Sequence, residues 1–145
     1  MRALTVQQPW AWAIVHGGKN VENRTRNLAG SYRGPVAIHA GLRTDEAAYD
    51  DDMIRSALTE VDDSWLLEER LATGVVLGVV DLAAVHHESD HGPGSRCSWW
   101  GQREVWHLQL ANPRPLATPI PARGRLGLWT PDAELAAAIR EQVPA

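Results

Sequence analysis

One short segment near the N-terminus, residues 17–24, combines the side chains best suited to chemistry. It contains Lys19, Glu22 and Arg24 behind two glycines. Lys19 is the only lysine of the chain, against thirteen arginines, so this position is expected to need a compact charge or a group that can lose a proton. Glu22 is close enough in sequence to pair with Lys19. Arg24 offers a planar set of donors that suits a phosphate or a base edge.

Several neighbouring residues could extend this segment into a binding surface. Arg26 and Arg33 would continue a basic strip along a nucleic-acid backbone, and Trp10 would supply a face on which a base stacks. His39 ends an apolar stretch, where it either lines a cleft or is a satisfied structural histidine. The predicted ligand-binding residues are Gln8, Trp10, Lys19, Glu22, Arg24, Arg26, Arg33 and His39.

Asp81 is the third candidate for catalysis, beside Lys19 and Glu22. It interrupts the apolar run from Val75 to Val85. An unpaired carboxylate is costly to bury, so Asp81 either faces outward or is placed to orient Lys19 or to bind a base edge. The competing interpretation is that Lys19 and its neighbours form an ion-pair network that only closes a helix.

Metal and cofactor sites are not predicted. His86, His87, Glu88, Asp90 and His91 crowd one segment, but their spacing matches no established site, and a polar loop explains them. Cys97 is the only cysteine, which excludes a disulfide within the chain and any all-cysteine metal site. We interpret it as an inert small residue.

Charge is distributed unevenly along the 145 residues, whose length and composition suit one globular domain. The net charge is −4, yet residues 1–43 carry +5, residues 44–90 carry −11 and residues 91–145 carry +2. Such segregation predicts a basic face on an acidic protein. The lone cysteine and the lack of a long apolar run favour a cytoplasmic protein without a membrane partner.

The elements that must position these residues follow from the apolar pattern. A strand over 3–7 is expected to lead into a helix with Pro9 in its first position, and Gly17-Gly18 to end that helix. Lys19 then lies at a helix C-terminus and starts an extended segment. The further expected elements are a strand at 36–40, an acidic helical region at 44–72 capped by Thr44, strands at 74–87 and 104–110, a short or edge strand at 116–120, and a helix at 132–143.

This order indicates an α+β protein with a small, mostly antiparallel barrel, because several strands follow one another with few helices between them. Two tryptophans, Trp106 and Trp129, are expected in its core. The segment 86–96 is expected to be a loop by composition.

Gly17, Lys19, Glu22 and Arg24 match the pattern Gly-x-Lys-x-x-Glu-x-Arg, which resembles the signature of the ASCH family. Other segments fall in the order of that family: Gln8-Pro9-Trp10, Tyr32-Arg33-Gly34-Pro35, the run 75–85, and the closing Gly124-Arg125-Leu126-Gly127-Leu128-Trp129. The resemblance covers nearly the whole chain, and the acidic insert is its least typical part.

The resemblance implies one PUA-like domain over residues 1–145, an antiparallel or mixed β-barrel flanked by helices, with a cleft between the first helix and the sheet. The fold alone does not imply an activity. The basic strip, the stacking face and the polar cleft together predict binding of RNA, of another single-stranded nucleic acid, or of a modified nucleobase or nucleoside, and no cofactor is predicted.

Two other functions stay open. One is a small hydrolase, because a bacterial acetylcytidine amidohydrolase is similar and uses a lysine, a threonine three residues later and a strand glutamate. Lys19 and Asp81 would take two of these roles, but Glu22 stands in place of the threonine, and Thr25 lies nearby. A ribonuclease using Lys19, Arg24 and His39 belongs to the same class. The other function is a protein-binding module that uses the acidic region 44–72.

Overall fold

A computed structural model describes residues 1–61 and 70–143 of the chain. Six strands form one curled sheet in the order β2-β5-β4-β3-β1-β6. The strands are β1 (Arg2–Gln8), β2 (Val21–Arg24), β3 (Gly34–Thr44), β4 (Val75–His87), β5 (Trp106–Pro121) and β6 (Leu128–Trp129). Only the β1–β3 pair is parallel among the strand pairs in these residues. The predicted α+β class is confirmed, with a mixed sheet.

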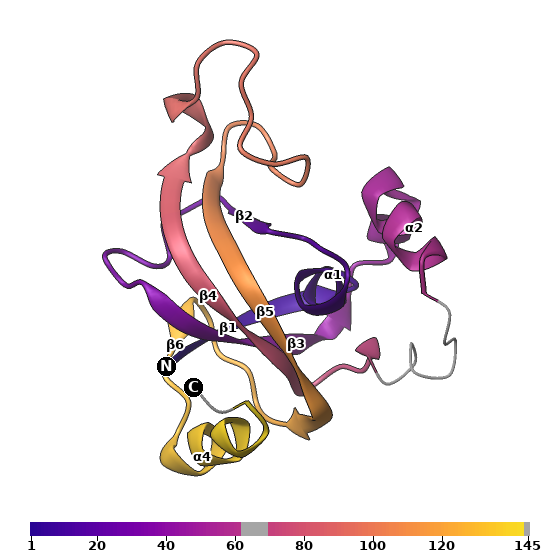
Figure 1. The fold of residues 1–145 in the computed structure, drawn as a ribbon, viewed down its shortest axis with the longest axis vertical. Coiled ribbons are helices and arrows are strands. Elements are labelled where there is room, and N and C mark those ends of the chain that lie inside the picture. The colour runs from indigo at the N-terminus through magenta and orange to yellow at the C-terminus, as the bar shows by residue number, and fades with distance from the viewer. Residues whose placement is uncertain (62–69, 144–145) are drawn as a thin grey trace.

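Three α-helices surround this sheet in the described residues: α1 (Trp10–His16), α2 (Asp52–Thr59) and α4 (Ala133–Gln142). Short 3-10 turns occupy Glu46–Asp50 and Glu88–Asp90. Figure 1 shows α1 end-on against the sheet and α2 farther out. It shows α4 near the C-terminal end of β5. Within the two described stretches, no helix has the length and apolar character needed to cross a membrane.

The core forms on both faces of the sheet because strand side chains alternate between faces. Leu4 and Val36 belong to a cluster that includes Ile14 and Val15 of α1. Their neighbours Ala3 and Ala37 belong to a second cluster, which includes Ile139 of α4. One face of the sheet is thus covered by α1 and the other by α4. Because residues 17–24 follow α1 directly, α1 holds the start of this motif segment against the sheet.

The helical region predicted at 44–72 begins later than expected. Thr44 is the last residue of β3 rather than a helix cap, because β3 continues past the predicted strand at 36–40 and pairs with β1 as far as Gln8. Asp51 is the actual cap of α2, and its carboxylate accepts hydrogen bonds from the backbone of Met53 and Ile54. The part of the prediction that falls on 62–69 lies outside the described residues.

The predicted strands at 104–110 and 116–120 are one strand, β5. The prolines predict that the second of these is short or at an edge, and the edge position is confirmed, because β2 pairs with β5 only from Trp106 to Gln109. Beyond Gln109, β5 pairs with β4 alone, so its prolines lie on a sheet edge where a missing N–H leaves no partner unsatisfied. Together, β4 and β5 form a long hairpin, and its loop lies at the top of Figure 1.

Candidate ligand-binding cleft

Two glycines turn the chain sharply from α1 into the motif segment. Gly18 has a φ of +77°, which favours glycine, and a Cβ on Gly17 would lie 3.0 Å from both the Cα of Ala13 and the ring of Trp12. The backbone N–H of Lys19 then donates to the carbonyl oxygen of Ala13 at 2.9 Å. The predicted helix end is confirmed, and Lys19 is fixed at the C-terminus of α1.

Lys19, Glu22 and Arg24 form a continuous charged network. Lys19 Nζ donates to Glu22 Oε1 at 2.8 Å and to the carbonyl oxygen of Val21. Arg24 Nε donates to Glu22 Oε2 at 3.0 Å, and Arg24 Nη2 donates to the carbonyl oxygen of Thr5 at 2.9 Å. Lys19 and Glu22 are buried, with 3% and 7% of their surfaces exposed, whereas Arg24 is partly exposed.

The charged form of Glu22 is maintained by its two neighbours. Burial by itself would raise the pKa of Glu22, but the charges of Lys19 and Arg24 and their hydrogen bonds together lower it below its ordinary value. Both carboxylate oxygens are engaged by a cation. Glu22 therefore acts as a fixed anion that orients two cations, and it is poorly placed to accept a further proton at neutral pH.

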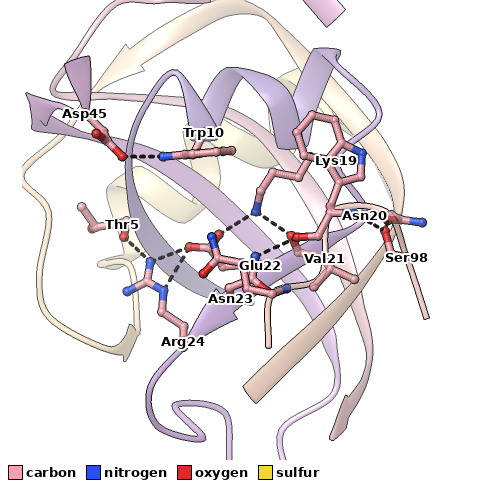
Figure 2. A network of polar contacts seen from close by, with 12 residues as sticks. Thr5, Trp10, Lys19, Asn20, Val21, Glu22, Asn23, Arg24, Asp45 and Ser98 are labelled. Carbon is pink, nitrogen blue, oxygen red and sulfur yellow. Dashed lines mark hydrogen bonds and ion pairs between the residues drawn. The ribbon is translucent and has the colours of Figure 1, made fainter. Parts of the chain in front are cut away.

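Trp10 lies over the Lys19 ammonium, with 5.6 Å between Nζ and the ring centroid (Figure 2). Its indole Nε1 donates to Asp45 Oδ2 at 2.9 Å, which fixes the plane of the ring. A cation at this distance from an indole face is attracted by the ring quadrupole. Trp10 therefore stabilises the ammonium on one side while Glu22 holds it on the other.

A second polar chain runs beside the network. Trp129 Nε1 donates to Thr5 Oγ1 at 3.1 Å, and His39 Nε2 lies 2.7 Å from the carbonyl oxygen of Ala122. Because a carbonyl only accepts, Nε2 carries the proton, and His39 Nδ1 accepts from Thr5 Oγ1 at 3.3 Å. Burial lowers the pKa of His39, although the Ala122 carbonyl opposes this, so His39 is neutral at neutral pH.

These groups line a cleft of about 1260 Å³. Five cationic and three acidic side chains face it, a lining charge of +2 on a protein of net charge −4. The charged lining residues are Lys19, Arg24, Arg43, Arg123, Arg125, Glu22, Asp45 and Asp51. Glu22 and Asp45 are already hydrogen-bonded within the protein. The cleft therefore offers more donors than acceptors to a ligand.

Part of the cleft lining is both apolar and exposed. Leu42, Trp99 and Leu126 line it, and their exposed fractions are 84%, 74% and 99%. Among the described residues, these three are the exposed large hydrophobic side chains, and all of them gather here. Exposed apolar surface concentrated at one cleft is typical of a binding site.

The wall that carries Trp99 is held by the motif segment itself. Asn23 Nδ2 donates to the carbonyl oxygen of Trp100 at 2.9 Å, and Asn23 Oδ1 accepts from the backbone of Gln102 at 2.8 Å. Ser98 Oγ donates to Asn20 Oδ1 on the same side (Figure 2). Asn20 and Asn23, which lie between the motif positions, therefore hold the loop between β4 and β5 in place as a wall of the cleft.

Five of the predicted site residues come together at the cleft: Trp10, Lys19, Glu22, Arg24 and His39. Arg26 and Arg33 lie outside its lining and are exposed, and Arg33 donates to the carbonyl oxygens of Gly30 and Tyr32. The predicted basic strip therefore leaves the cleft after Arg24.

Gln8 is fully buried and lies outside the cleft lining. Its Oε1 accepts from the backbone N–H of Trp12 at 2.9 Å, and its Nε2 donates to the carbonyl oxygens of Arg70 and Ala72, both at 2.9 Å. All hydrogen-bonding groups of this amide except one lone pair are occupied. Gln8 therefore caps α1 and ties it to the segment just before β4, away from a ligand.

Asp81 also lies outside the cleft, on β4. It pairs with Arg114 on β5, with Oδ1 2.9 Å from Nη2, and accepts from Asn112 Nδ2 at 3.2 Å. These hydrogen bonds lower its pKa against the opposing effect of burial. Asp81 is thus the outward-facing carboxylate of a cross-strand ion pair, and it orients neither Lys19 nor a ligand in the cleft.

Sequence reasoning missed the residues that come from distant segments. Trp99 lies in the loop between β4 and β5, and Arg123 and Arg125 lie after β5. Arg125 belongs to the closing segment that resembled the family, which was the available signal. Arg43 contributes to the positive charge of residues 1–43, but no sequence pattern indicates that it lies at the cleft.

The ASCH domain family model matches residues 4–120. Among solved structures, an ASCH protein from Zymomonas mobilis is similar, with a TM-score of 0.51 and 17% identity over 95% of this chain and 92% of that one. A tyrosine-to-phenylalanine mutant of it has a TM-score of 0.54 and 17% identity over 95% of both chains. A serine-to-alanine mutant has a TM-score of 0.52 and 17% identity over 97% and 94%. At this identity the likeness establishes a shared fold, and the predicted PUA-like class is confirmed.

Proposed function

The chain belongs to the ASCH domain family, and from this premise we propose that its cleft binds single-stranded RNA or a modified nucleoside without transforming it. The family is PUA-like and associated with RNA binding. The observation that carries the proposal is the buried network in which Glu22 holds Lys19 and Arg24 at the wall of the cleft.

The network leaves donors for a ligand. Lys19 has three N–H groups and uses two of them on Val21 and Glu22. Arg24 uses Nε and Nη2, and its Nη1 makes no hydrogen bond to the described residues. Donors held this rigidly suit the carbonyl and ring-nitrogen acceptors of a base or the oxygens of a phosphate.

The rest of the cleft suits a nucleotide. Its volume of about 1260 Å³ exceeds that of a typical small-molecule pocket, which leaves room for a base and part of a backbone. Trp99 offers a large exposed ring for stacking, and the guanidinium of Arg96 lies 4.6 Å from its centroid. Arg123 and Arg125 also line the cleft and are exposed, so they add positive charge that suits a backbone phosphate.

A hydrolase finds less support. The carboxylate nearest Lys19 is Glu22, which is ionised with both oxygens engaged, and Asp81 is bound by Arg114 away from the cleft. The hydroxyl of Thr5 lines the cleft beside His39, but a Cβ on Gly124 would lie only 2.7 Å from it, so the backbone covers it. We therefore assign the network to recognition.

The test compares two charge-matched double variants by fluorescence anisotropy with a mixed single-stranded RNA. Arg123→Ala/Arg125→Ala removes two cleft charges, and Arg26→Ala/Arg33→Ala removes two charges outside the cleft. Each lost phosphate contact should reduce the slope of log K against log salt by about 0.7. We expect weaker binding and a shallower slope for the first variant and wild-type behaviour for the second.

A parallel incubation with acetylcytidine and with the RNA, read by mass spectrometry, tests the absence of chemistry. Equal effects of the two double variants would refute binding in the cleft. A product that forms with the wild type and disappears in Lys19→Ala would establish an enzyme instead, and its mass would distinguish deacylation from strand cleavage.

A further inference from the structure

Four side chains with metal-binding atoms meet at the loop end of the β4–β5 hairpin. His86 is the second-to-last residue of β4 and is paired in register with His107 of β5. His91 and Cys97 come from the loop that connects these strands. One donor atom from each of the four lies within 4.8 Å of the other three. The hairpin thus gathers three imidazoles and a thiol at one point.

The spacing of these atoms is close to that of a tetrahedral site. Cys97 Sγ lies 3.2 Å from His107 Nδ1, and His86 Nε2 lies 2.6 Å from His91 Nε2. With Zn–N of about 2.0 Å and Zn–S of about 2.3 Å, tetrahedral ligand atoms are roughly 3.3–3.6 Å apart. Small rotations of the two histidine rings would therefore centre an ion among the four atoms.

The surroundings of His107 fix the ring nitrogen that a metal needs. Nε2 lies 2.6 Å from the carbonyl oxygen of Gln102, so Nε2 carries the proton and Nδ1 presents its lone pair toward Cys97. A ligating histidine that donates its other N–H to a backbone carbonyl is the usual outer arrangement of protein metal sites. His107 is also buried, with 3% of its surface exposed.

The backbone of Gly101 packs closely against the imidazole ring of His107. A Cβ on Gly101 would lie 2.9 Å from His107 Cε1 and 3.4 Å from Nδ1. Only glycine lets the loop backbone pack on the imidazole at this distance. The same Gly101 lines the ligand-binding cleft on its other side. The four-residue cluster and the cleft wall therefore share one piece of backbone.

We propose that His86, His91, Cys97 and His107 bind one Zn²⁺ ion. Three imidazole nitrogens and one thiolate suit this borderline-soft cation, whereas Mg²⁺ and Ca²⁺ prefer oxygen ligands. Four protein ligands close the coordination sphere, which is typical of a structural rather than a catalytic zinc site. The spacing within residues 86–91 predicts no metal site, because the set is completed by Cys97 and by a histidine on the next strand.

The ion would hold the loop that forms one wall of the cleft. Cys97 lies two residues before Trp99, and Gly101 packs against the ring of His107. Zinc binding is therefore expected to order the segment from 91 to 103, on which the position of Trp99 depends.

The experiment measures zinc binding by the whole protein. Protein stripped with a chelator is titrated with Zn²⁺ against a chromogenic chelator. We expect one ion per chain. Cys97→Ala and His91→Ala should weaken binding by about 100-fold or more, beyond the 10–100-fold effect of losing an outer partner. The matched control is His87→Ala, because His87 is a half-buried histidine of the same hairpin that lies outside the cluster and instead accepts from the backbone N–H of Ser89.

Two measurements on the wild type keep the test decisive where a variant fails to fold. Cobalt added to the stripped protein should give a thiolate-to-metal charge-transfer band, and zinc should protect Cys97 from alkylation, read by mass spectrometry. Binding without this band or this protection would overturn the proposal. So would the absence of stoichiometric binding, or an equal loss of affinity in His87→Ala.

Discussion

At the scale of single residues, Glu22 fixes the positions of the two cations at the wall of the cleft. It is the buried anion between two cations, 2.8 Å from Lys19 Nζ and 2.9 Å from Arg24 Nη2. Removing one member of a buried ion pair leaves the others uncompensated. We therefore expect Glu22→Gln to lower the free energy of unfolding by about 3 kcal/mol at neutral pH, measured by urea denaturation.

The pH dependence of this loss follows from the pKa of Glu22. Lys19 and Arg24 lower that pKa below 4.5, its ordinary value, despite the opposing effect of burial. The unfolded chain therefore binds the proton first as the pH falls, and the stability that Glu22 contributes is lost as the pH falls through its folded pKa. The difference between wild type and Glu22→Gln should narrow below pH 4.5. A constant difference, or an equal loss in the exposed control Glu141→Gln, would contradict this prediction.

Gly124 is a second position in the cleft, and adding a single Cβ atom there is expected to destabilise the fold. Its backbone lies against the Thr5–His39 pair, and an added Cβ would lie 2.7 Å from Thr5 Oγ1 and 2.8 Å from His39 Cε1. Overpacking of this kind typically costs about 1–3 kcal/mol, so we expect Gly124→Ala to lower the unfolding midpoint in urea accordingly.

The matched control for Gly124 is Gly92→Ala, because a Cβ at Gly92 meets nothing within 4 Å. This variant should stay within about 0.5 kcal/mol of the wild type. If both variants lose the same stability, the cost comes from the backbone of glycine in general and not from the contact with Thr5 and His39.

Single residues were predictable where the local chain alone determines their role. The lone lysine behind two glycines, with a glutamate and an arginine in reach, indicated the network correctly. Gln8 and Asp81 could not be assigned in this way. The partners of Gln8 are the carbonyls of Arg70 and Ala72, and the partner of Asp81 is Arg114, all brought close only by the sheet.

At the scale of elements, the loop between β4 and β5 depends on the motif strand. Asn23 on β2 holds both the carbonyl of Trp100 and the N–H of Gln102. A net hydrogen bond contributes about 1 kcal/mol, so Asn23→Ala should accelerate hydrogen exchange at the Gln102 amide by roughly fivefold. Ligand affinity should fall with it, because Trp99 lies in the same loop.

Asn27→Ala is the control for this loop. Asn27 also binds two backbone groups, the N–H groups of Ala29 and Gly30, but in a loop outside the cleft lining. It should leave the exchange of Gln102 unchanged. Unchanged exchange in Asn23→Ala as well would mean that other contacts hold this wall of the cleft.

Elements were predictable by type more than by length. The apolar run identified β4, and the glycines identified the end of α1, because these signals are local. The continuation of β3 to Thr44 and the length of β5 depend on pairing with β1 and β4. Until those partners are known, Thr44 resembles a helix cap, and the prolines indicate only that a strand at 116–120 is short or at an edge.

At the scale of the molecule, charge segregation predicted a basic face, but it did not predict which residues line the cleft. The first third of the chain supplies Lys19, Arg24 and Arg43 to the cleft, while Arg123 and Arg125 come from the last fifth. The segment after β5 lies beyond the family match, which ends at residue 120. The cleft is therefore complete only when the C-terminal part folds onto the sheet.

This dependence predicts that residues 1–145 unfold as one domain. Ile139 of α4 is 1% exposed and packs in a cluster with Ala3 of β1 and Trp129 of β6. Ile139→Ala should lower the free energy of unfolding by about 2–5 kcal/mol, whereas Leu126→Ala, at a side chain 99% exposed, should change it little. Trp129 also donates to Thr5 in the cleft, so loosening α4 cannot be confined to the C-terminus. Tryptophan fluorescence and far-ultraviolet circular dichroism should give coincident transitions in both variants. Separate transitions in Ile139→Ala would instead show that the C-terminal segment unfolds independently of the sheet.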